Sequence, residues 1–294
     1  MKKKEIFRGA ATALVTPFKN GAVNYDELKR LIEYQIAGGI SAIVVCATTG
    51  EVPTLEDVEH QRIIKFSAEV IKGRVPLIAG TGSNNTAHAM MMSRQAKANG
   101  ADALLVVTPY YNRATEKGLT DSFLMIADAT DLPMILYNVP SRTSVNIPLE
   151  VYRTLAVHPN IVAVKEASGN IAAVASIIAE CGDKLKVYSG NDDMIVPTLS
   201  LGGNGVISVL SNMLPSAVSR MCNEWFSGRH REATDLQLKY MSLIRALFSQ
   251  VNPIPIKAAL RELGFDTAEL RLPLCEMDEK PKRELLRQMK RLGL

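Results

Sequence analysis

The chain has 294 residues, of which 47% are hydrophobic and 22% are charged, with a formal net charge of +4. This composition is typical of a globular protein with a large core and excludes an intrinsically disordered chain. The basic residues are spread along the chain and no apolar run approaches the roughly 20 residues of a membrane span, so we predict neither a nucleic-acid nor a membrane partner. The four cysteines show neither close pairing nor metal-ligand spacing, which favours the reducing cytoplasm.

Eight short apolar runs alternate with amphipathic stretches along the chain. Strands that are covered on both faces are continuously apolar, so these runs are typical of a parallel sheet. The predicted strands are 10–15, 42–46, 76–80, 103–107, 134–138, 161–167, 185–190 and 205–209. Repeated strand–helix units predict an α/β fold, a (β/α)8 or TIM barrel over residues 1–212.

The stretches between the runs carry residues that commonly start helices. Asn24 precedes a predicted helix at 25–37. Thr54 with Asp57 predicts a capping-box-like start for the next helix, and Thr86 precedes a methionine-rich one.

Residues 213–294 continue beyond the eighth strand and read as further helices. Helices are predicted at 216–226, 232–248 and 256–263, and the segment Asn252-Pro253-Ile254-Pro255 is predicted to be a rigid connector. We therefore predict a single domain over residues 1–294, in which a C-terminal helical extension packs on the barrel.

Lys165 is the cationic residue of the buried run at 161–167. The reactive groups of a TIM barrel lie at the carboxyl ends of its strands, where this lysine is expected. Burial disfavours the ammonium form, which leaves more free amine to attack a carbonyl group. The alternative is an ion pair with Glu166 or another carboxylate, and position alone does not decide between the two.

Tyr137 ends the strand that precedes the strand of Lys165. Consecutive strands of such a barrel are neighbours, so we expect the two side chains to be adjacent. A phenol beside the amine can donate and accept the protons that Schiff-base formation requires. The alternative is a tyrosine that only packs in the core or at the rim.

Thr48-Thr49-Gly50-Glu51 follow the second predicted strand. This segment places hydroxyl groups and backbone N–H groups at the top of the barrel, where they suit a carboxylate. The alternative is an ordinary turn between a strand and a helix, with threonine caps.

The sequence does not indicate a metal or a cofactor. Gly80-Thr81-Gly82 is too short for a dinucleotide fingerprint, and no glycine-rich phosphate cradle follows the seventh strand. The histidines are scattered and form no ligand cluster: they are His60, His88, His158 and His230.

Six segments form a pattern that extends through nearly the whole chain. They are Val15-Thr16-Pro17-Phe18, Thr48-Thr49-Gly50-Glu51, Pro109-Tyr110-Tyr111-Asn112, Tyr137-Asn138-Val139-Pro140, Val164-Lys165-Glu166-Ala167 and Gly205-Val206-Ile207-Ser208-Val209. In this order, the pattern resembles the pyruvate-dependent aldolase superfamily that contains N-acetylneuraminate lyase and dihydrodipicolinate synthase.

The resemblance implies a catalytic role for four residues. Lys165 corresponds to the lysine that forms a Schiff base with pyruvate. Tyr137, Thr48 and Tyr111 correspond to the family's proton relay, in which the last tyrosine crosses a dimer interface. The resemblance therefore also implies a homo-oligomer, either a dimer or a tetramer.

The resemblance assigns substrate contacts as well. Thr49 and the adjacent Gly50 correspond to the residues that hold the pyruvate carboxylate. Gly190 and Ile207 correspond to residues that line the pocket.

Arg142 decides between branches of the superfamily. Its planar guanidinium group suits a second carboxylate, and aspartate 4-semialdehyde carries one. The synthases have an arginine at this position, whereas the sialic acid lyases lack it. The resemblance therefore favours the condensation of pyruvate with aspartate 4-semialdehyde in lysine biosynthesis. The alternatives are an aldolase that cleaves a hydroxylated 2-keto acid and a catalytically silent relative, although every relay position is filled here.

Lysine inhibits some synthases of this family by binding a cleft at the dimer interface. His88 stands where lysine-sensitive relatives have a glutamate, and an imidazole is a poor partner for an amino group. We expect weak or absent inhibition, with Asp57 as the remaining carboxylate. The corresponding cleft positions are Val52, Pro53, Asp57, His60, Asn84, His88 and Tyr110.

Overall fold

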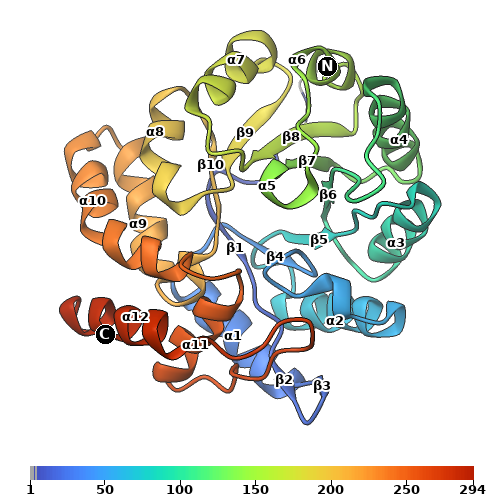
Figure 1. The fold of residues 1–294 in the computed structure, drawn as a ribbon. Helices are drawn as coiled ribbons and strands as arrows, with labels where there is room; N and C mark the ends of the chain where they lie inside the picture. Colours follow the sequence, from blue (N-terminus) through green and yellow to red (C-terminus); the bar gives the residue numbers. More distant parts are fainter. Residues whose placement is uncertain (1–2, 4) are drawn as a thin grey trace.

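The computed structural model of the chain describes residue 3 and residues 5–294. Within this part of the chain, eight parallel strands close into one barrel, in which β1 pairs with both β10 and β4 (Figure 1). The strands are β1 (Gly9–Ala13), β4 (Ala42–Val45), β5 (Leu77–Gly80), β6 (Ala103–Val107), β7 (Met134–Asn138), β8 (Ile161–Glu166), β9 (Lys186–Ser189) and β10 (Gly205–Ser208). The predicted TIM barrel is confirmed, and each predicted strand end lies within two residues of the observed one.

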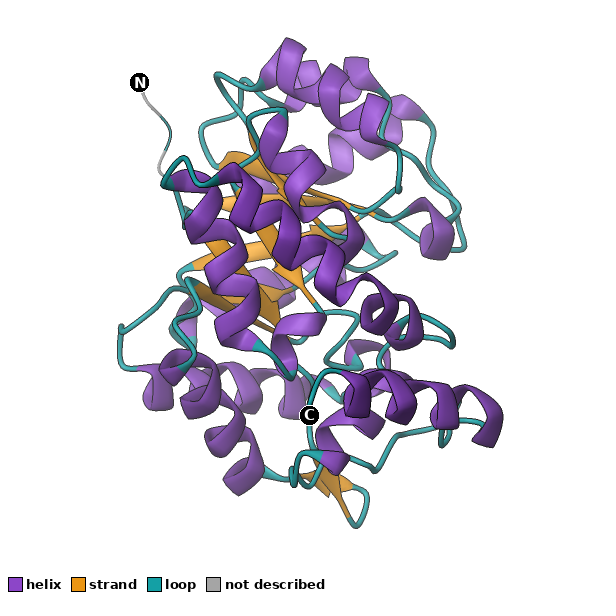
Figure 2. Cartoon of the chain, turned by 90° about the vertical axis from the view of Figure 1, so that its left-hand side faces the viewer, coloured by secondary structure: helices purple, strands orange, loops and turns teal. Residues whose placement is uncertain are grey.

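Helices surround the strands on the outside of the barrel, as Figure 2 shows. They are α1 (Tyr25–Ala37), α2 (Asp57–Ile71), α3 (Thr86–Ala98), α4 (Glu116–Asp128), α6 (Leu149–Leu155), α7 (Ile171–Cys181), α8 (Ile195–Ser200) and α9 (Pro215–Phe226). Short elements precede some of them: the hairpin of β2 (Phe18–Lys19) and β3 (Ala22–Val23), the helix α5 (Pro140–Thr143), and the 3-10 turns η1 (Val52–Thr54), η2 (Asp192–Met194) and η3 (Leu210–Asn212). All of these insertions follow the carboxyl end of a strand, so they shape the end of the barrel that carries active sites.

The starts of the first three helices follow the predicted chemistry in part. Asn24 caps α1 as predicted, because its side chain accepts a backbone N–H of the first turn. The prediction that Thr54 starts the second helix is wrong, since Thr54 ends η1 and Glu56 occupies the cap position of α2. Thr86 is the first residue of α3, and Asn85 caps that helix.

The C-terminal extension lies outside the ring of barrel helices, at the left and lower left of Figure 1. It contains α10 (His230–Leu247), α11 (Ile254–Glu262) and α12 (Glu279–Arg291), and α10 packs against α9 and α12. The predicted helices at 216–226, 232–248 and 256–263 correspond to α9, α10 and α11, whereas α12 was not among the predicted helices. The predicted boundary after residue 212 assigns α9 to the extension, but α9 packs against β1 as a barrel helix does. The division of the chain at this residue therefore stays a prediction.

The described residues contain no helix that combines the length and the apolar character of a membrane span.

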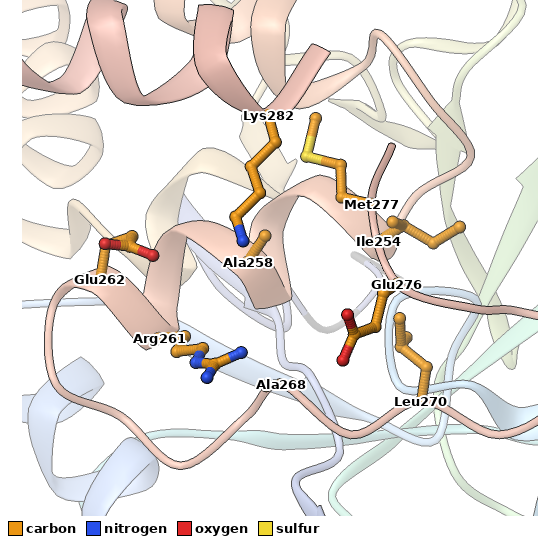
Figure 3. Close-up of a pocket in the computed structure, with 9 residues that line it drawn as sticks. All are labelled: Ile254, Ala258, Arg261, Glu262, Ala268, Leu270, Glu276, Met277 and Lys282. Atoms are coloured by element: carbon orange, nitrogen blue, oxygen red, sulfur yellow. The ribbon is translucent and has the colours of Figure 1, made fainter. Parts of the chain in front are cut away.

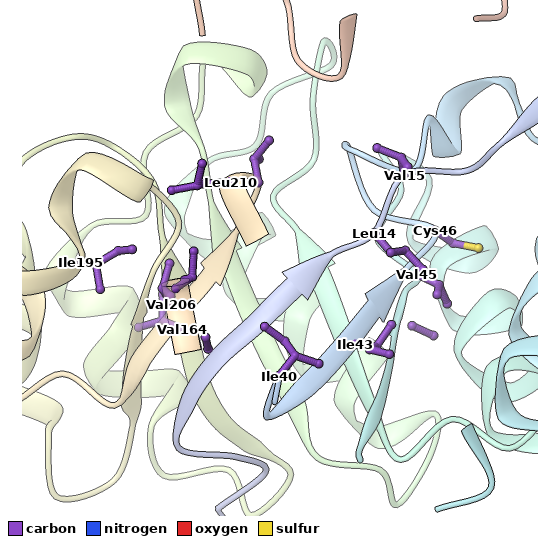
Figure 4. Close-up of a cluster of buried hydrophobic side chains, with 14 of the residues drawn as sticks. Leu14, Val15, Ile40, Ile43, Val45, Cys46, Val164, Ile195, Val206 and Leu210 are labelled. Atoms are coloured by element: carbon purple, nitrogen blue, oxygen red, sulfur yellow. The ribbon is translucent and has the colours of Figure 1, made fainter. Parts of the chain in front are cut away.

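Side chains along the strands alternate between a cluster inside the barrel and a cluster between strands and helices. The exception on β8 is a register shift, where Val162 and Ala163 both belong to the inner cluster. On β8, Ala163 belongs to the inner cluster and Val164 to the outer one. Figure 4 shows part of the outer cluster, which includes Val164, Val206 and Ile195. The next inward position of β8 after Ala163 is Lys165, so the strand period directs this amine into the barrel.

Candidate active site

Lys165 and Tyr137 face the inside of the barrel from neighbouring strands. The register pairs Tyr137 of β7 with Lys165 of β8, and Lys165 Nζ lies 4.3 Å from the centroid of the Tyr137 ring. Both residues are buried, with 4% and 6% of their surface exposed. The predicted adjacency is therefore confirmed. A buried amine beside a phenol can attack a carbonyl carbon while the phenol transfers protons.

The residues that follow these two positions point to the outer side of the barrel wall and connect the strands. Glu166 accepts hydrogen bonds from Asn138 Nδ2 at 2.9 Å and from Tyr152 Oη at 3.2 Å. Its second oxygen accepts the backbone N–H of Ser168 at 2.7 Å. Burial and the nearby Glu166 raise the pKa of Tyr152, so this phenol remains a donor. The alternative ion pair between Lys165 and Glu166 is absent from the described residues.

The turn at residues 48–51 follows β4 and accepts hydrogen bonds from one residue near the start of the chain and one in the C-terminal extension. Thr16 Oγ1 donates to the carbonyl oxygen of Gly50 at 2.7 Å, and Asn252 Nδ2 donates to Thr49 Oγ1 at 2.9 Å. Thr49 and Gly50 are buried, and Thr48 is half-buried. Because Thr49 Oγ1 accepts from Asn252, its own hydrogen can be donated to a bound anion.

Arg142 lies on α5, directly after the strand of Tyr137. Its Nη2 donates to the carbonyl oxygen of Asn252 at 3.1 Å, and the rest of its exposed side chain retains further donors. Asn252 therefore connects Arg142 to Thr49, so the structure brings the two candidate carboxylate-binding residues together. The sequence patterns miss Asn252, since they indicate only a connector at 252–255. An asparagine directly before Pro253, in a segment with a second proline at 255, was the available signal.

Gly190 directly follows β9, and Ile207 lies on β10, the next strand around the barrel. A Cβ atom at Gly190 would lie 2.5 Å from the Cβ of Ala167, so only glycine allows the ends of β8 and β9 to approach this closely. Ile207 on β10 is fully buried in the inner cluster that also contains Tyr137. Both positions therefore border the space near Lys165.

Tyr111 lies apart from the other candidates within the single chain. Its side chain is 94% exposed, and its φ of 68° is in the left-handed region. Its loop is nevertheless held in place, because Asn112 Nδ2 donates to the Asn84 carbonyl oxygen at 2.9 Å. A strained backbone that displays an aromatic ring to solvent is a feature of functional sites and interfaces.

A cavity of about 410 Å³ opens beside the ends of β8 and β9, a volume that suits a small organic molecule. The sequence patterns miss Asp192 in its wall, whose Oδ2 accepts the backbone N–H groups of Val209 at 3.0 Å and Leu210 at 2.8 Å. Burial raises the pKa of Asp192. The lining residues are Ser141, Ala167, Ser168, Gly169, Asn191, Asp192, Asp193, Ile244, Arg245 and Phe248.

Among the residues that the structure describes, no group of three or more His, Cys, Asp or Glu side chains is arranged to hold a metal ion. Two histidines near the 48–51 turn have other partners. His60 Nε2 donates to the Gly80 carbonyl oxygen at 2.8 Å, and burial lowers the pKa of His60. His88 Nε2 lies 3.0 Å from Asp57 Oδ1.

A TIM barrel with an amine and a phenol buried at adjacent strand ends has the layout of a Schiff-base-forming aldolase. Residues 6–292 match the model of the dihydrodipicolinate synthetase family, and the chain belongs to that family.

The chain is 50% identical over 289 residues to 4-hydroxy-tetrahydrodipicolinate synthase 1 of Clostridium acetobutylicum, which covers 98% of this chain and 99% of that protein. It is 52% identical over 291 residues to the 4-hydroxy-tetrahydrodipicolinate synthase of Lachnoclostridium phytofermentans, covering 98% and 99% of the two chains. The crystal structure of dihydrodipicolinate synthase from Thermotoga maritima superposes with a TM-score of 0.96 at 40% identity, over 98% of this chain and 99% of that one.

Proposed function

We propose that this chain is a Schiff-base-forming synthase that condenses pyruvate with L-aspartate 4-semialdehyde to 4-hydroxy-tetrahydrodipicolinate, in lysine and diaminopimelate biosynthesis. The observation that carries this proposal is the Lys165 amine buried against Tyr137 inside the barrel. About 50% identity over nearly the full length of synthases supports the choice of substrates. The four cysteines, which are free in the described chain, support the cytoplasm as the compartment.

Lys165 starts the reaction by adding its amine to the keto carbon of pyruvate. Loss of water from the carbinolamine gives the imine, and loss of a methyl proton gives the enamine. The enamine carbon then forms the new C–C bond with the aldehyde carbon, and the amino group of the aldehyde substrate displaces Lys165 as the ring closes. Tyr137 is placed to move protons in these steps because its ring contacts the amine.

The other candidate residues serve this reaction in three ways. Thr48 and Tyr111 complete the proton relay that begins at Tyr137. Thr49 and Gly50 bind the pyruvate carboxylate, and Arg142 binds the carboxylate of the aldehyde. Gly190 and Ile207 line the pocket. The 94% exposure of Tyr111 supports a homo-oligomer, since a second subunit is required to place this phenol in a dry relay.

Borohydride reduction in the presence of pyruvate tests the central step. We expect a reduced pyruvyl adduct on Lys165, located by mass spectrometry, and Lys165→Ala should lose both the adduct and the activity. Lys186→Ala on the neighbouring strand is the control and should still be trapped. An adduct on another lysine, or an active protein without an adduct, contradicts the proposal.

Replacement of Arg142 tests the identity of the aldehyde. Arg142→Ala should lower kcat/KM for aspartate 4-semialdehyde by about 10- to 150-fold, since one charged hydrogen-bonded contact is worth about 1.5 to 3 kcal/mol. Pyruvate trapping should remain near the parent level. Arg153→Ala on the surface of α6 is the control, and equal activity of Arg142→Ala and the parent would indicate a different aldehyde.

Tyr111 links activity to assembly. We expect a dimer or tetramer by sedimentation, and Tyr111→Phe should slow condensation because the relay loses a hydroxyl group. Tyr110→Phe, at the adjacent position, should retain the parent rate. A monomer with full activity would rule out a relay that is shared between subunits.

Lysine should inhibit this enzyme weakly or not at all. His88 replaces the glutamate of lysine-sensitive relatives, and the Asp57 carboxylate, which could substitute, already contacts His88 Nε2 at 3.0 Å. The measurement is a titration of initial rates with lysine at fixed pyruvate, with His88→Glu as the variant expected to gain sensitivity. Substantial inhibition of the parent at submillimolar lysine would show that Asp57 leaves His88 to bind the ligand.

A further inference from the structure

Lys257 is a fully buried charged residue on α11, in the C-terminal extension. Its Nζ lies 2.7 Å from Glu51 Oε1, and neither side chain has any exposed surface. The ammonium also donates to the carbonyl oxygens of Thr16, at 3.0 Å, and Glu269. It lies 4.6 Å from the centroid of the Phe18 ring. One side chain thus joins α11 to the 48–51 turn and to the Thr16–Phe18 segment.

Burial of this ion pair costs free energy, because both groups are removed from water. Burial lowers the pKa of Lys257, and the attraction of Glu51 opposes that shift. Similar buried pairs in other proteins can be replaced by neutral groups without loss of stability, so stability alone is a weak reason for such a pair. A buried ion pair does fix the relative position of the segments that carry it.

Glu51 is the last residue of the turn and has a left-handed backbone, with φ 55° and ψ 35°. This conformation is unfavourable for a residue with a side chain, so it requires support from its surroundings. The Glu51 N–H donates to the Thr48 carbonyl oxygen at 3.1 Å and closes the turn. The carboxylate supplies the support, because Lys257 holds one oxygen and the backbone N–H of Arg271 contacts the other at 3.3 Å.

The Thr16 segment supports the same turn from the other side. The Thr16 carbonyl oxygen accepts from Lys257, while the Thr16 hydroxyl donates to the Gly50 carbonyl oxygen at 2.7 Å. Lys257 therefore controls the turn both directly through Glu51 and indirectly through Thr16. This contact also gives a role to the Val15–Phe18 segment, to which no step of the reaction assigns one.

A small cavity borders α11 near the helix positions next to Lys257. Figure 3 shows a cavity there, lined in part by Ala258, Arg261, Glu276 and Lys282. Its volume is about 30 Å³, which has room for a few water molecules. The contacts that connect α11 to the 48–51 turn are those of Lys257.

We propose that Lys257 is a positioning residue, whose ammonium group holds the 48–51 turn in the conformation that presents Thr49 and Gly50 to the pyruvate carboxylate. The proposal rests on the proposed function of this turn. It makes the C-terminal extension a part of the pyruvate site, although α11 itself does not touch the substrate.

The test measures the pyruvate concentration that gives half-maximal borohydride trapping on Lys165, and KM for each substrate. In Lys257→Met we expect the half-saturating pyruvate concentration and KM for pyruvate to rise by about 10- to 100-fold, as misplacement of binding groups produces. KM for the aldehyde should remain near the parent value. Glu51→Gln keeps the shape of the side chain but removes the ion pair, and should shift the same two quantities in the same direction.

The double variant Glu51→Gln/Lys257→Met separates positioning from folding. It leaves no unpaired buried charge, so its Tm should return toward the parent value while its pyruvate affinity stays low. Leu119→Ala on α4 is the matched control, because it lowers Tm by opening a core cavity and should leave pyruvate affinity unchanged.

Two results would overturn the proposal. Parent-like half-saturation by pyruvate in Glu51→Gln and in the double variant would show that the pair only stabilises the fold, even if Lys257→Met alone fails to fold. Failure of the parent protein to be trapped by pyruvate would instead remove the proposed function, and the positioning role with it.

Discussion

The two-residue period of β8 inside a closed barrel is the constraint on which the site depends. It turns Ala163 and Lys165 inward and Val164 and Glu166 outward. A slip of one residue would exchange the amine for the carboxylate at the reactive position. The bond from Asn138 to Glu166 and the bond from Tyr152 prevent that slip, since they hold the carboxylate on the outer side.

The same register determines which groups can reach the amine. Parallel pairing of β7 with β8 sets Tyr137 beside Lys165, and the close approach of β8 and β9 at Gly190 keeps the neighbouring wall near. The loops carry the other candidate residues to the same end of the barrel, because the 48–51 turn and α5 both follow the carboxyl ends of strands. The candidate catalytic residues Lys165 and Tyr137 thus lie on strands, whereas the candidate binding residues Thr49, Gly50 and Arg142 lie on the segments that follow strands.

The barrel was predictable because each of its strands is a continuous apolar run between helix signals. The position of Lys165 at a buried strand end was also predictable, because this cation is conspicuous in an otherwise apolar run. α12 has the charged sequence EKPKRELLRQMKR, and its buried residues are Leu285, Gln288 and Met289. Leu285, Met289 and Leu292 recur at helical spacing in an otherwise charged stretch, so an amphipathic helix was readable there and the prediction missed it.

The contacts of Asn252 and Lys257 could not be read from local patterns. Asn252 Nδ2 reaches Thr49 across 203 positions of the chain, and Lys257 reaches Glu51 across 206. Residues 252–255 have the composition of a connector, and Lys257 falls at an ordinary place in an amphipathic helix. Only the fold shows that both side chains reach the 48–51 turn, for which the sequence predicted a carboxylate site or an ordinary strand-to-helix turn but no long-range partner.

The meeting of residue 257 with residues 16 and 51 has a consequence for synthesis on the ribosome. The last barrel strand ends at Ser208, so about 50 further residues must be made before Lys257 emerges, which takes several seconds at roughly 5–20 residues per second. During that interval a nascent chain can pair all eight strands while Glu51 still lacks its cation. Pairing of the barrel strands can therefore precede the contact that holds the 48–51 turn, and any chain that ends before residue 257 lacks the cation that Glu51 meets in the complete fold.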